Sequence, residues 1–320
     1  MSNAGAAKAE TELVRRLREE LAGCGRHRAA AASTPWPSDF VDDMAAVDAE
    51  TGGLLWTVDM LMDGVDFDSK SHRWYDIGRK AMAVNLSDCA AMAVQPVAAL
   101  CAVALDNKLS LDDALALIRG AHEFGMRFRC PIVGGDTNSW NSPTVVSITV
   151  AARPEPGRHP VCRDGARLGD QVYLTGPVGG SLLGRHMTFE PRIELALTLN
   201  RRLSPSAMID ISDGLALDLW RILEASGCGA TLDATRVEAA IHPDAVQMAS
   251  RDGRSPREHA LYDGEDFELI VVLPPRVPPE ECAALGLLPL GQIDASGGLV
   301  LREADGRCTP IERRGWEHFR

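Results

Sequence analysis

"DIGRKAMAVNLSDCAAMAVQPVAALCAVAL", residues 76–105, places two hydrophobic patterns one directly after the other. Segment 76–93 spaces its apolar side chains as one face of an α-helix does, and 97–105 is a short apolar run typical of a buried strand. Together they predict a helix that leads into a buried strand. This order indicates a mixed α/β layer fold.

The segments on either side continue the alternation of helices and strands. On the N-terminal side, the pattern predicts an amphipathic helix over 11–23 and a strand over 52–60. On the C-terminal side we expect a helix over 110–126, a short strand over 131–137 that ends in a glycine turn, and a strand over 144–152.

A segment rich in proline, glycine and arginine, 153–170, interrupts this periodicity and is the predicted domain boundary. It divides the chain into an N-terminal domain, 1–152, and a C-terminal α/β domain, 153–320. In the second domain, a strand at 207–211 is expected to run into a helix at 213–226.

The composition narrows the class of protein. The chain has 320 residues, of which 45% are hydrophobic, enough for a core in each of two domains. A formal net charge of −12 argues against nucleic acid and anionic membrane surfaces as partners. No apolar run approaches the roughly 18 residues of a membrane span, so a cytoplasmic location is expected. The eight cysteines show no CxxC pair and are read as reduced thiols that pack in the core.

One carboxylate lies where the helical pattern predicts burial. Asp88 is on the apolar face of the helix over 76–93, four residues after Val84. It either pairs with a cation, for which Arg79 and Lys80 are candidates, or is turned to solvent, or has a function.

Carboxylates occur at four other places where a structural role alone is awkward: Asp42 with Asp43, Asp59, Asp136, and Asp210 with Asp213. Structural alternatives remain, since the first pair can form a turn and Ser212 or Asp213 can cap the helix that follows. If the carboxylates converge, however, each pair ~4 Å apart repels by roughly 4 kcal/mol at an effective dielectric near 20. Mg²⁺ suits such oxygen ligands and binds phosphates beside them, so phosphoryl transfer is the natural chemistry.

Eight blocks of the chain form an ordered set: "DDMAAVD" (42–48), "TVDMLMDGVDFD" (57–68), "IGRKAMAVNLSDCAAMAVQPVAAL" (77–100), "VGGDT" (133–137), "YLTGPVGGSLLG" (173–184), "AMIDISDGLALDL" (207–219), "DGEDFELIVVL" (263–273) and "GWEHF" (315–319). In this order they resemble the motifs of the bacterial thiamine-monophosphate kinase family. The wider superfamily uses ATP without a P-loop, and the chain has no GxxxxGK[ST] motif.

The resemblance implies a two-domain α/β protomer of the aminoimidazole ribonucleotide synthetase-like fold. N-terminal sheets would join into a barrel across a homodimer, with ATP and several Mg²⁺ ions between the domains. The implied reaction is direct in-line transfer of the γ-phosphoryl group of ATP to thiamine monophosphate, with no residue acting as a covalent nucleophile.

The resemblance also implies roles for single residues. By motif, the metal ligands are Asp43, Thr57, Asp59, Asp88, Asp136, Asp210 and Asp213. The ATP contacts are Gly135, Arg163 and Ser212, and the substrate positions are Asp66, Glu265 and Trp316. A guanidinium such as that of Arg163 can bind phosphate oxygens bidentately, although an ordinary linker arginine is the alternative. The aromatic face of Trp316 can cover a heteroaromatic ring, and a C-terminal hydrophobic anchor is the alternative.

Four departures from the family pattern affect the substrate assignment more than the fold. Val41 replaces a glycine, Asp263 replaces a glycine, and the chain is shorter than expected between 184 and 191. Most important, Asp66 replaces a histidine that contacts substrate in the family. An ionised carboxylate only accepts hydrogen bonds and repels a phosphate, so Asp66 either reaches a cation, points to solvent or marks a different acceptor.

Other functions therefore stay open. The same ATP and Mg²⁺ site could act on another phosphorylated acceptor, or the chain could bind nucleotide without turnover. Cys24 weakly resembles the cysteine motif of selenophosphate synthetases, whereas the terminal "HFR" differs from the terminal cysteine of the hydrogenase-maturation type.

Overall fold

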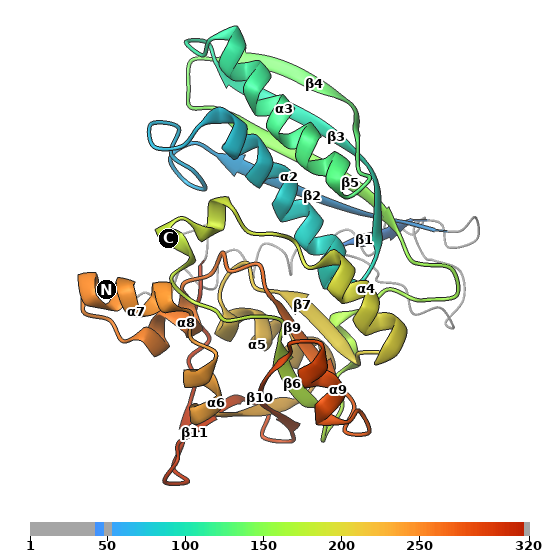
Figure 1. Cartoon of the computed structure of the whole chain (residues 1–320), viewed down its shortest axis with the longest axis vertical. Coiled ribbons are helices and arrows are strands. Elements are labelled where there is room, and N and C mark those ends of the chain that lie inside the picture. The colour runs from blue at the N-terminus through green and yellow to red at the C-terminus, as the bar shows by residue number, and fades with distance from the viewer. Residues whose placement is uncertain (1–41, 48–52, 317–320) are drawn as a thin grey trace, which may run out of the picture.

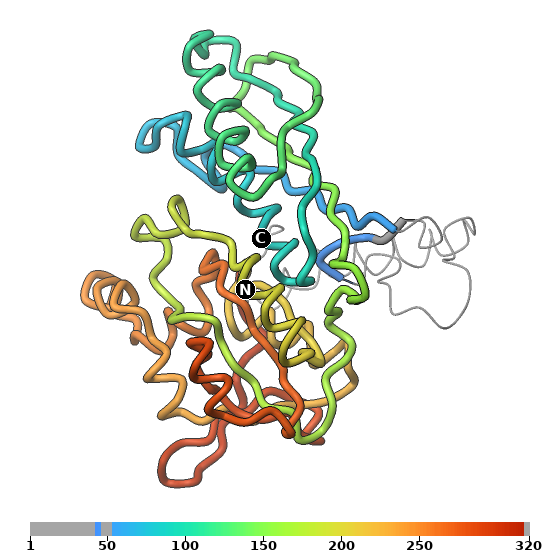
Figure 2. Tube along the Cα trace, turned by 45° about the vertical axis from the view of Figure 1, so that its right-hand side comes forward, coloured from blue at the N-terminus to red at the C-terminus, as the bar shows by residue number. Residues whose placement is uncertain are grey.

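The computed structural model describes residues 42–47 and 53–316. The helix predicted over 11–23, together with Cys24 and Val41, lies outside the described residues. Figure 1 shows the N-terminal sheet with its helices above the second, C-terminal sheet. Figure 2 shows the two halves as separate lobes of one trace.

The N-terminal half is built on a sheet that has, within the described residues, five strands in the order β1-β2-β5-β3-β4. The strands are β1 (Ala45–Val47), β2 (Leu54–Met62), β3 (Gln95–Asp106), β4 (Ile132–Trp140) and β5 (Val145–Arg153). Only β3 and β4 pair in parallel, and the other pairs are antiparallel. Along β2 buried and exposed side chains largely alternate, so Leu55, Thr57 and Leu61 face the helices.

Two helices, α2 (Trp74–Ala91) and α3 (Leu111–Arg127), pack against each other on one face of this sheet, as Figure 1 shows. Two glycines allow their close approach. A Cβ on Gly78 would lie 1.8 Å from the carbonyl oxygen of Leu117, and one on Gly120 would lie 1.9 Å from that of Tyr75. The helices therefore touch backbone to backbone.

The glycine turn predicted after the strand at 131–137 is wrong, because β4 continues through both glycines to Trp140. A Cβ on Gly135 would lie 1.8 Å from the carbonyl oxygen of Cys101 on β3. Glycine is thus required here by the close approach of two strands and not by a reversal of the chain.

The C-terminal half has, among the described residues, a seven-stranded sheet in the order β12-β11-β8-β10-β6-β9-β7. Its strands are β6 (Gln171–Leu174), β7 (Ala207–Asp210), β8 (Gly229–Asp233), β9 (Leu269–Leu273), β10 (Leu288–Asp294), β11 (Leu299–Arg302) and β12 (Cys308–Pro310). Its helices are α4 (Ile193–Arg202), α5 (Leu215–Ser226), α6 (Ala234–Ala239), α7 (Pro243–Asp252), α8 (Pro256–Tyr262) and α9 (Pro279–Ala284). The mixed α/β class is as predicted.

The two halves share a hydrophobic core. Between β5 and β6 the chain forms only a 3₁₀ turn at Arg163–Gly165. Yet α2 packs against both α4 and β7, and one cluster of buried side chains runs from Ile77 to Met208. This shared core holds α2 against the end of β7.

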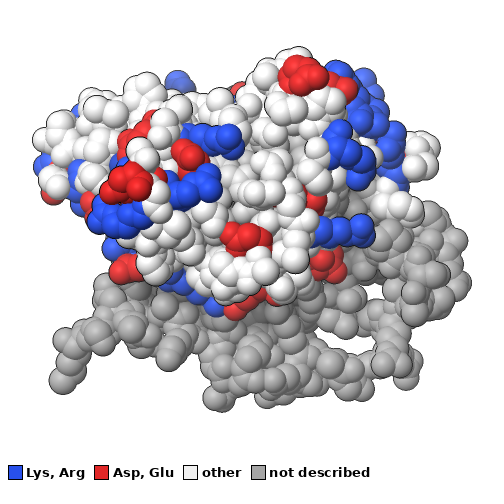
Figure 3. Space-filling model, turned by 90° about the horizontal axis from the view of Figure 1, so that it is seen from below, with Lys and Arg blue, Asp and Glu red and all other residues white. Residues whose placement is uncertain are grey.

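None of the helices in the described ranges is long and apolar enough to cross a bilayer. On the face in Figure 3, acidic and basic side chains are both present, and several of them lie next to each other among uncharged ones.

Candidate active site

Three aspartates predicted as metal ligands converge. One carboxylate oxygen each from Asp43, Asp88 and Asp210 lies within 4.8 Å of the other two. They come from the start of the described chain, the last turn of α2 and the last residue of β7. They meet because the shared core brings α2 against β7.

Hydroxyl groups support two of these carboxylates. Thr57 Oγ1 on β2 donates to Asp88 Oδ2, and Ser87 Oγ donates to Asp210 Oδ2 at 2.5 Å. Thr57 was also predicted as a metal ligand, and its hydroxyl is bonded directly to one of the three carboxylates. The short polar side chains thus fix carboxylate positions that the backbone alone would leave free to rotate.

Burial and mutual repulsion make the carboxylates of this cluster more stable when they bind protons or cations. Burial, and then the neighbouring carboxylates, raise the pKa of Asp88 and that of Asp210 well above the usual aspartate value. Burial and the charges of Asp43, Asp213 and Asp66 raise the pKa of Asp59 to about 6. Asp59 is therefore close enough to extend the same acidic region.

The contacts around Asp88 and Asp42 contradict two structural roles that the sequence allows. Asp88 does not pair with a neighbour on α2, because Arg79 donates to the carbonyl oxygen of Met187 at 3.0 Å and Lys80 pairs with Glu265. Asp42 and Asp43 are more than a turn, since Asp42 Oδ2 accepts from the backbone N–H of Arg163 at 3.0 Å.

The capping alternative for Ser212 or Asp213 is also wrong. The residue at the N-cap of α5 is Gly214, and the backbone N–H groups of Asp213 and Gly214 donate to Asp218 Oδ2 at 3.0 and 3.1 Å. Asp213 is left to form an ion pair with Arg221. Asp218, which the sequence did not single out, lies in the first turn of α5 and stabilises the preceding loop by accepting both of these hydrogen bonds.

Two arginines balance part of the negative charge. The guanidinium of Arg163 donates to Asp43 and is largely buried, with 16% of its side chain exposed. Arg221 bridges Asp213 and Asp218, with 2.5 Å between Arg221 Nη1 and Asp218 Oδ1. Arg163 therefore lies beside the aspartate cluster, where phosphate oxygens would be its alternative partners.

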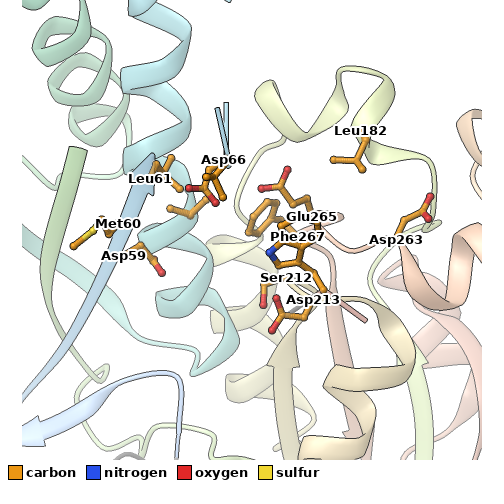
Figure 4. Close-up of a pocket in the computed structure, with 13 residues that line it drawn as sticks. Asp59, Met60, Leu61, Asp66, Leu182, Ser212, Asp213, Asp263, Glu265 and Phe267 are labelled. Atoms are coloured by element: carbon orange, nitrogen blue, oxygen red, sulfur yellow. The ribbon is translucent and has the colours of Figure 1, made fainter. Parts of the chain in front are cut away.

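A cavity of about 350 Å³ lies beside Asp59 and Asp213. Its lining includes five carboxylates, two aromatic rings, Ser212 and several apolar side chains, but no lysine or arginine among the described residues. The carboxylates are those of Asp59, Asp66, Asp213, Asp263 and Glu265, and the rings are those of Phe267 and Trp316. In Figure 4 the carboxylates of Asp66 and Glu265 face each other, with Asp59 and Asp213 lower in the same view. All three predicted substrate positions therefore line one cavity.

A buried lysine joins two walls of this cavity. Lys80 is 0% exposed, and its Nζ lies 2.6 Å from the carbonyl oxygen of Asp66 and 2.7 Å from Glu265 Oε1. Glu265 has a φ of +52°, and its backbone N–H donates to the carbonyl oxygen of Ser212 at 2.8 Å. Lys80 was considered only as a partner of Asp88. Its position four residues before Val84 on the apolar face was the signal that it is buried.

The carboxylate of Asp263, which replaces a family glycine, has polar partners next to it. Its carboxylate lies 2.9 Å from Arg254 Nη1 and 2.7 Å from His259 Nδ1. Its side chain is 3% exposed.

Gly135 and Asp136 are not brought to the cluster within one chain. Across the sheet, Asp59 pairs with Ile148, Ile148 with Cys101, and Cys101 with Gly135. Gly135 is thus three strands from Asp59, or about 14 Å at the usual strand spacing. Asp136, the next residue, is exposed on the edge strand β4.

Known proteins resemble this chain in sequence and in fold. Residues 41–153 match the family described as AIR synthase related protein, N-terminal domain. A thiamine-monophosphate kinase of Rhodopirellula baltica is 38% identical over 295 residues, covering 90% of this chain and 89% of the relative. The Bacillus subtilis thiamine-monophosphate kinase is 31% identical over 310 residues, covering 87% and 92%. The solved structure of "AaThiL complexed with AMPPCP and TMP" superposes with a TM-score of 0.81 at 26% identity, covering 98% of this chain and 97% of that one.

Proposed function

We propose, because this chain belongs to the thiamine-monophosphate kinase family, that it transfers the γ-phosphoryl group of ATP to the phosphate of thiamine monophosphate. The product is thiamine diphosphate. The observation that carries the proposal is the convergence of Asp43, Asp88 and Asp210, together with a cavity lined by Asp59 and Asp213 whose size suits a small organic acceptor.

Magnesium ions fit the residues present. Three carboxylates within 4.8 Å, with pKa values raised in two of them, form a donor set that is destabilised until cations neutralise it. In this proposal the ions are held by Asp43, Thr57, Asp59, Asp88, Asp136, Asp210 and Asp213. Bound Mg²⁺ would neutralise the negative charge of the phosphate oxygens.

The chain's own residues bind and orient the nucleotide. Arg163 exchanges part of its contact with Asp43 for phosphate oxygens of ATP, which it binds as a planar fork. Ser212 borders the cavity at the turn between β7 and α5. Gly135, the third proposed ATP contact, would come from a second copy of the chain. ATP therefore lies on the side of the cavity where Asp59 and Asp213 are.

Glu265, Trp316 and Asp66 hold the acceptor in this cavity. The aromatic faces of Phe267 and Trp316 cover its rings, while Lys80 fixes the carboxylate of Glu265. With acceptor and nucleotide in neighbouring parts of one site, transfer is direct and in line. Positioning and charge neutralisation supply the rate acceleration, and no side chain forms a phosphorylated intermediate.

A homodimer of two-domain protomers completes this proposal, with domains at 1–152 and 153–320. The face of the N-terminal sheet opposite α2 and α3 exposes Val58, Met60 and Met62 on β2 and Leu100 on β3. An apolar face of this kind on a soluble protein marks an interaction site. Joining two such faces by a two-fold axis forms the expected barrel, and Gly135 and Asp136 of one copy then serve the site of the other.

The experiment is an assay of purified protein with Mg-ATP and thiamine monophosphate, in which thiamine diphosphate and ADP are quantified by chromatography. Equal amounts of both products are expected, and Asp210→Asn serves as the inactive control. No diphosphate at saturating Mg-ATP contradicts the proposal. Transfer to a different phosphorylated metabolite would instead identify another acceptor, and calorimetric binding of ATP without transfer to any acceptor would indicate a non-catalytic paralogue.

A further inference from the structure

Among the carboxylates of the cavity, Asp66 differs in that its side chain neither forms an ion pair within the described residues nor belongs to the acidic region proposed to hold Mg²⁺. Its Oδ2 accepts the backbone N–H of Met62 at 2.7 Å, and within the described ranges it forms no ion pair. Lys80 reaches the backbone carbonyl of Asp66, but its ion pair is with Glu265. The Asp66 side chain therefore presents to the cavity a carboxylate that has no ion-pair partner of its own among the described residues.

The other four carboxylates that line the cavity have an ion-pair partner or belong to the proposed Mg²⁺ site. Glu265 is paired with Lys80, Asp213 with Arg221, and Asp263 with Arg254. Asp59 belongs to the acidic region around Asp43, Asp88 and Asp210, which is proposed to hold Mg²⁺. Only the charge of Asp66 is left for a ligand in the cavity.

The remaining lining indicates what kind of ligand that is. Phe267 and Trp316 offer aromatic surface, and Val65, Val84 and Leu182 offer apolar surface. Since no basic side chain of the described residues lines the cavity, an anionic group has no direct partner at this end. A flat aromatic ring with a delocalised positive charge satisfies both the rings and the carboxylate.

We propose that Asp66 is a specificity-determining residue that recognises the cationic ring of the acceptor. This inference rests on the proposed function, in which that ring is the thiazolium of thiamine monophosphate. It also orients the acceptor, because the carboxylate attracts the ring and repels the phosphate, which is thereby directed toward the proposed Mg²⁺ site. The carboxylate that replaces a family histidine is then compatible with thiamine monophosphate as acceptor.

The test combines a change of charge on the protein with a change of charge on the ligand. Asp66→Asn removes the charge and keeps an oxygen that can accept the Met62 N–H. The ligand pair is thiamine monophosphate and its deaza analogue, in which carbon replaces the thiazolium nitrogen and the ring is neutral. Dissociation constants are measured by calorimetry with Mg²⁺ and a non-hydrolysable ATP analogue present.

In the wild type we expect the neutral analogue to bind about tenfold more weakly than the cation, because a close and partly buried charge pair is lost. In Asp66→Asn the dissociation constants of the two ligands should differ by less than about twofold, because the cationic ligand binds more weakly than it does to the wild type. Asp68→Asn removes an exposed charge from the same loop, outside the cavity lining, and should retain the wild-type difference. Equal discrimination in the wild type and Asp66→Asn, or none in the wild type, overturns the inference.

Kinetics provide a second readout. Asp66→Asn should raise the KM for thiamine monophosphate about tenfold, while kcat and the KM for ATP change less than about twofold. A fall in kcat with an unchanged KM contradicts a binding role. If the wild type forms no diphosphate, the proposed function fails, whereas diphosphate formation without charge discrimination removes only the inference about Asp66.

Discussion

Lys80 connects two segments that line the cavity. A fully buried ammonium is tolerated here because Asp66 supplies a carbonyl oxygen and Glu265 a carboxylate. The two acceptors belong to the loop after β2 and to the turn before β9. The lysine therefore holds two walls of the cavity in one arrangement.

We expect Lys80→Met to lower the free energy of unfolding by about 3 kcal/mol, because it leaves the mostly buried carboxylate of Glu265 without its cation. Urea denaturation checks this value. Lys70→Met, an exposed position in the same region, should change the stability by less than about 0.5 kcal/mol. If Lys80→Met is as stable as that control, the ion pair does not stabilise the fold.

The aspartate cluster predicts an unusual mutational effect at Asp88. Asp88→Asn keeps an acceptor for the Thr57 hydroxyl and removes one of three mutually repelling charges. The melting temperature in EDTA should therefore rise by about 2 °C, while the stabilisation by Mg-ATP analogue should be lost. Asp112→Asn on α3, which is exposed, is the matched control and should change neither value. A variant that is less stable in EDTA, or that keeps the full Mg²⁺ effect, contradicts the role of Asp88.

At the scale of elements, the α2–α3 contact depends on two glycines. Alanine normally favours a helix over glycine by about 1 kcal/mol, so a gain would be expected from propensity alone. At Gly120, however, the added Cβ would lie 1.9 Å from the carbonyl oxygen of Tyr75, and the helices would have to separate. We expect Gly120→Ala to destabilise the protein by about 2 kcal/mol or more.

The control for this prediction is Gly298→Ala, where the nearest heavy atom to the new Cβ is Trp220 Cη2 at 3.9 Å. Its stability should stay within about 0.5 kcal/mol of the wild type. Equal melting temperatures for the two variants would show that α2 and α3 adjust their packing without cost.

Helices and strands were largely predictable from local pattern. The helix expected over 76–93 is α2, Trp74–Ala91, and the strand expected over 52–60 is β2, Leu54–Met62. The error at β4 has a physical cause. Its last eight residues are all exposed on an edge strand, so they carry no alternation of apolar and polar side chains that would predict a strand.

At the scale of the whole molecule, the buried carboxyls set the direction of the pH dependence. The pKa of Asp266 is raised by burial to about 7, and those of Asp88 and Asp210 are raised well above the usual value. A carboxyl with a raised folded-state pKa binds its proton more tightly in the folded protein than in the unfolded chain. Stability is thus lost as the pH rises from about 4 through the folded-state pKa.

We expect the metal-free protein to lose about 1 kcal/mol or more of stability between pH 6.5 and 7.5. His186 acts in the opposite direction, because burial lowers its pKa to about 4, but above its unfolded-state value of about 6.5 it adds less than about 0.5 kcal/mol of stability. Denaturation in EDTA at both pH values checks the sign, and saturating Mg²⁺ should reduce the difference. A stability that increases over this interval would mean that the carboxyls are not perturbed as described.

If the exposed face of the N-terminal sheet forms the dimer interface, one added charge on it should separate the two copies. Val58 is 62% exposed, so Val58→Asp should leave the protomer folded and convert the proposed dimer to monomers in light scattering. Leu111→Asp changes an even more exposed apolar residue, at 75%, on α3, and should leave the dimer intact. A dimeric Val58→Asp would place the interface elsewhere.

The sequence by itself determined the α/β class, most elements and the identity of the acidic residues, because hydrophobic period and residue type are local properties. It also located Asp66 as the point of departure from the family. Only the tertiary structure decided which carboxylates meet, because α2, β2 and β7 are distant in sequence and converge through a shared core. It likewise paired Lys80 with Glu265, left the Asp66 side chain without an ion pair and placed Asp136 on an edge strand, since these outcomes depend on packing and register between distant segments.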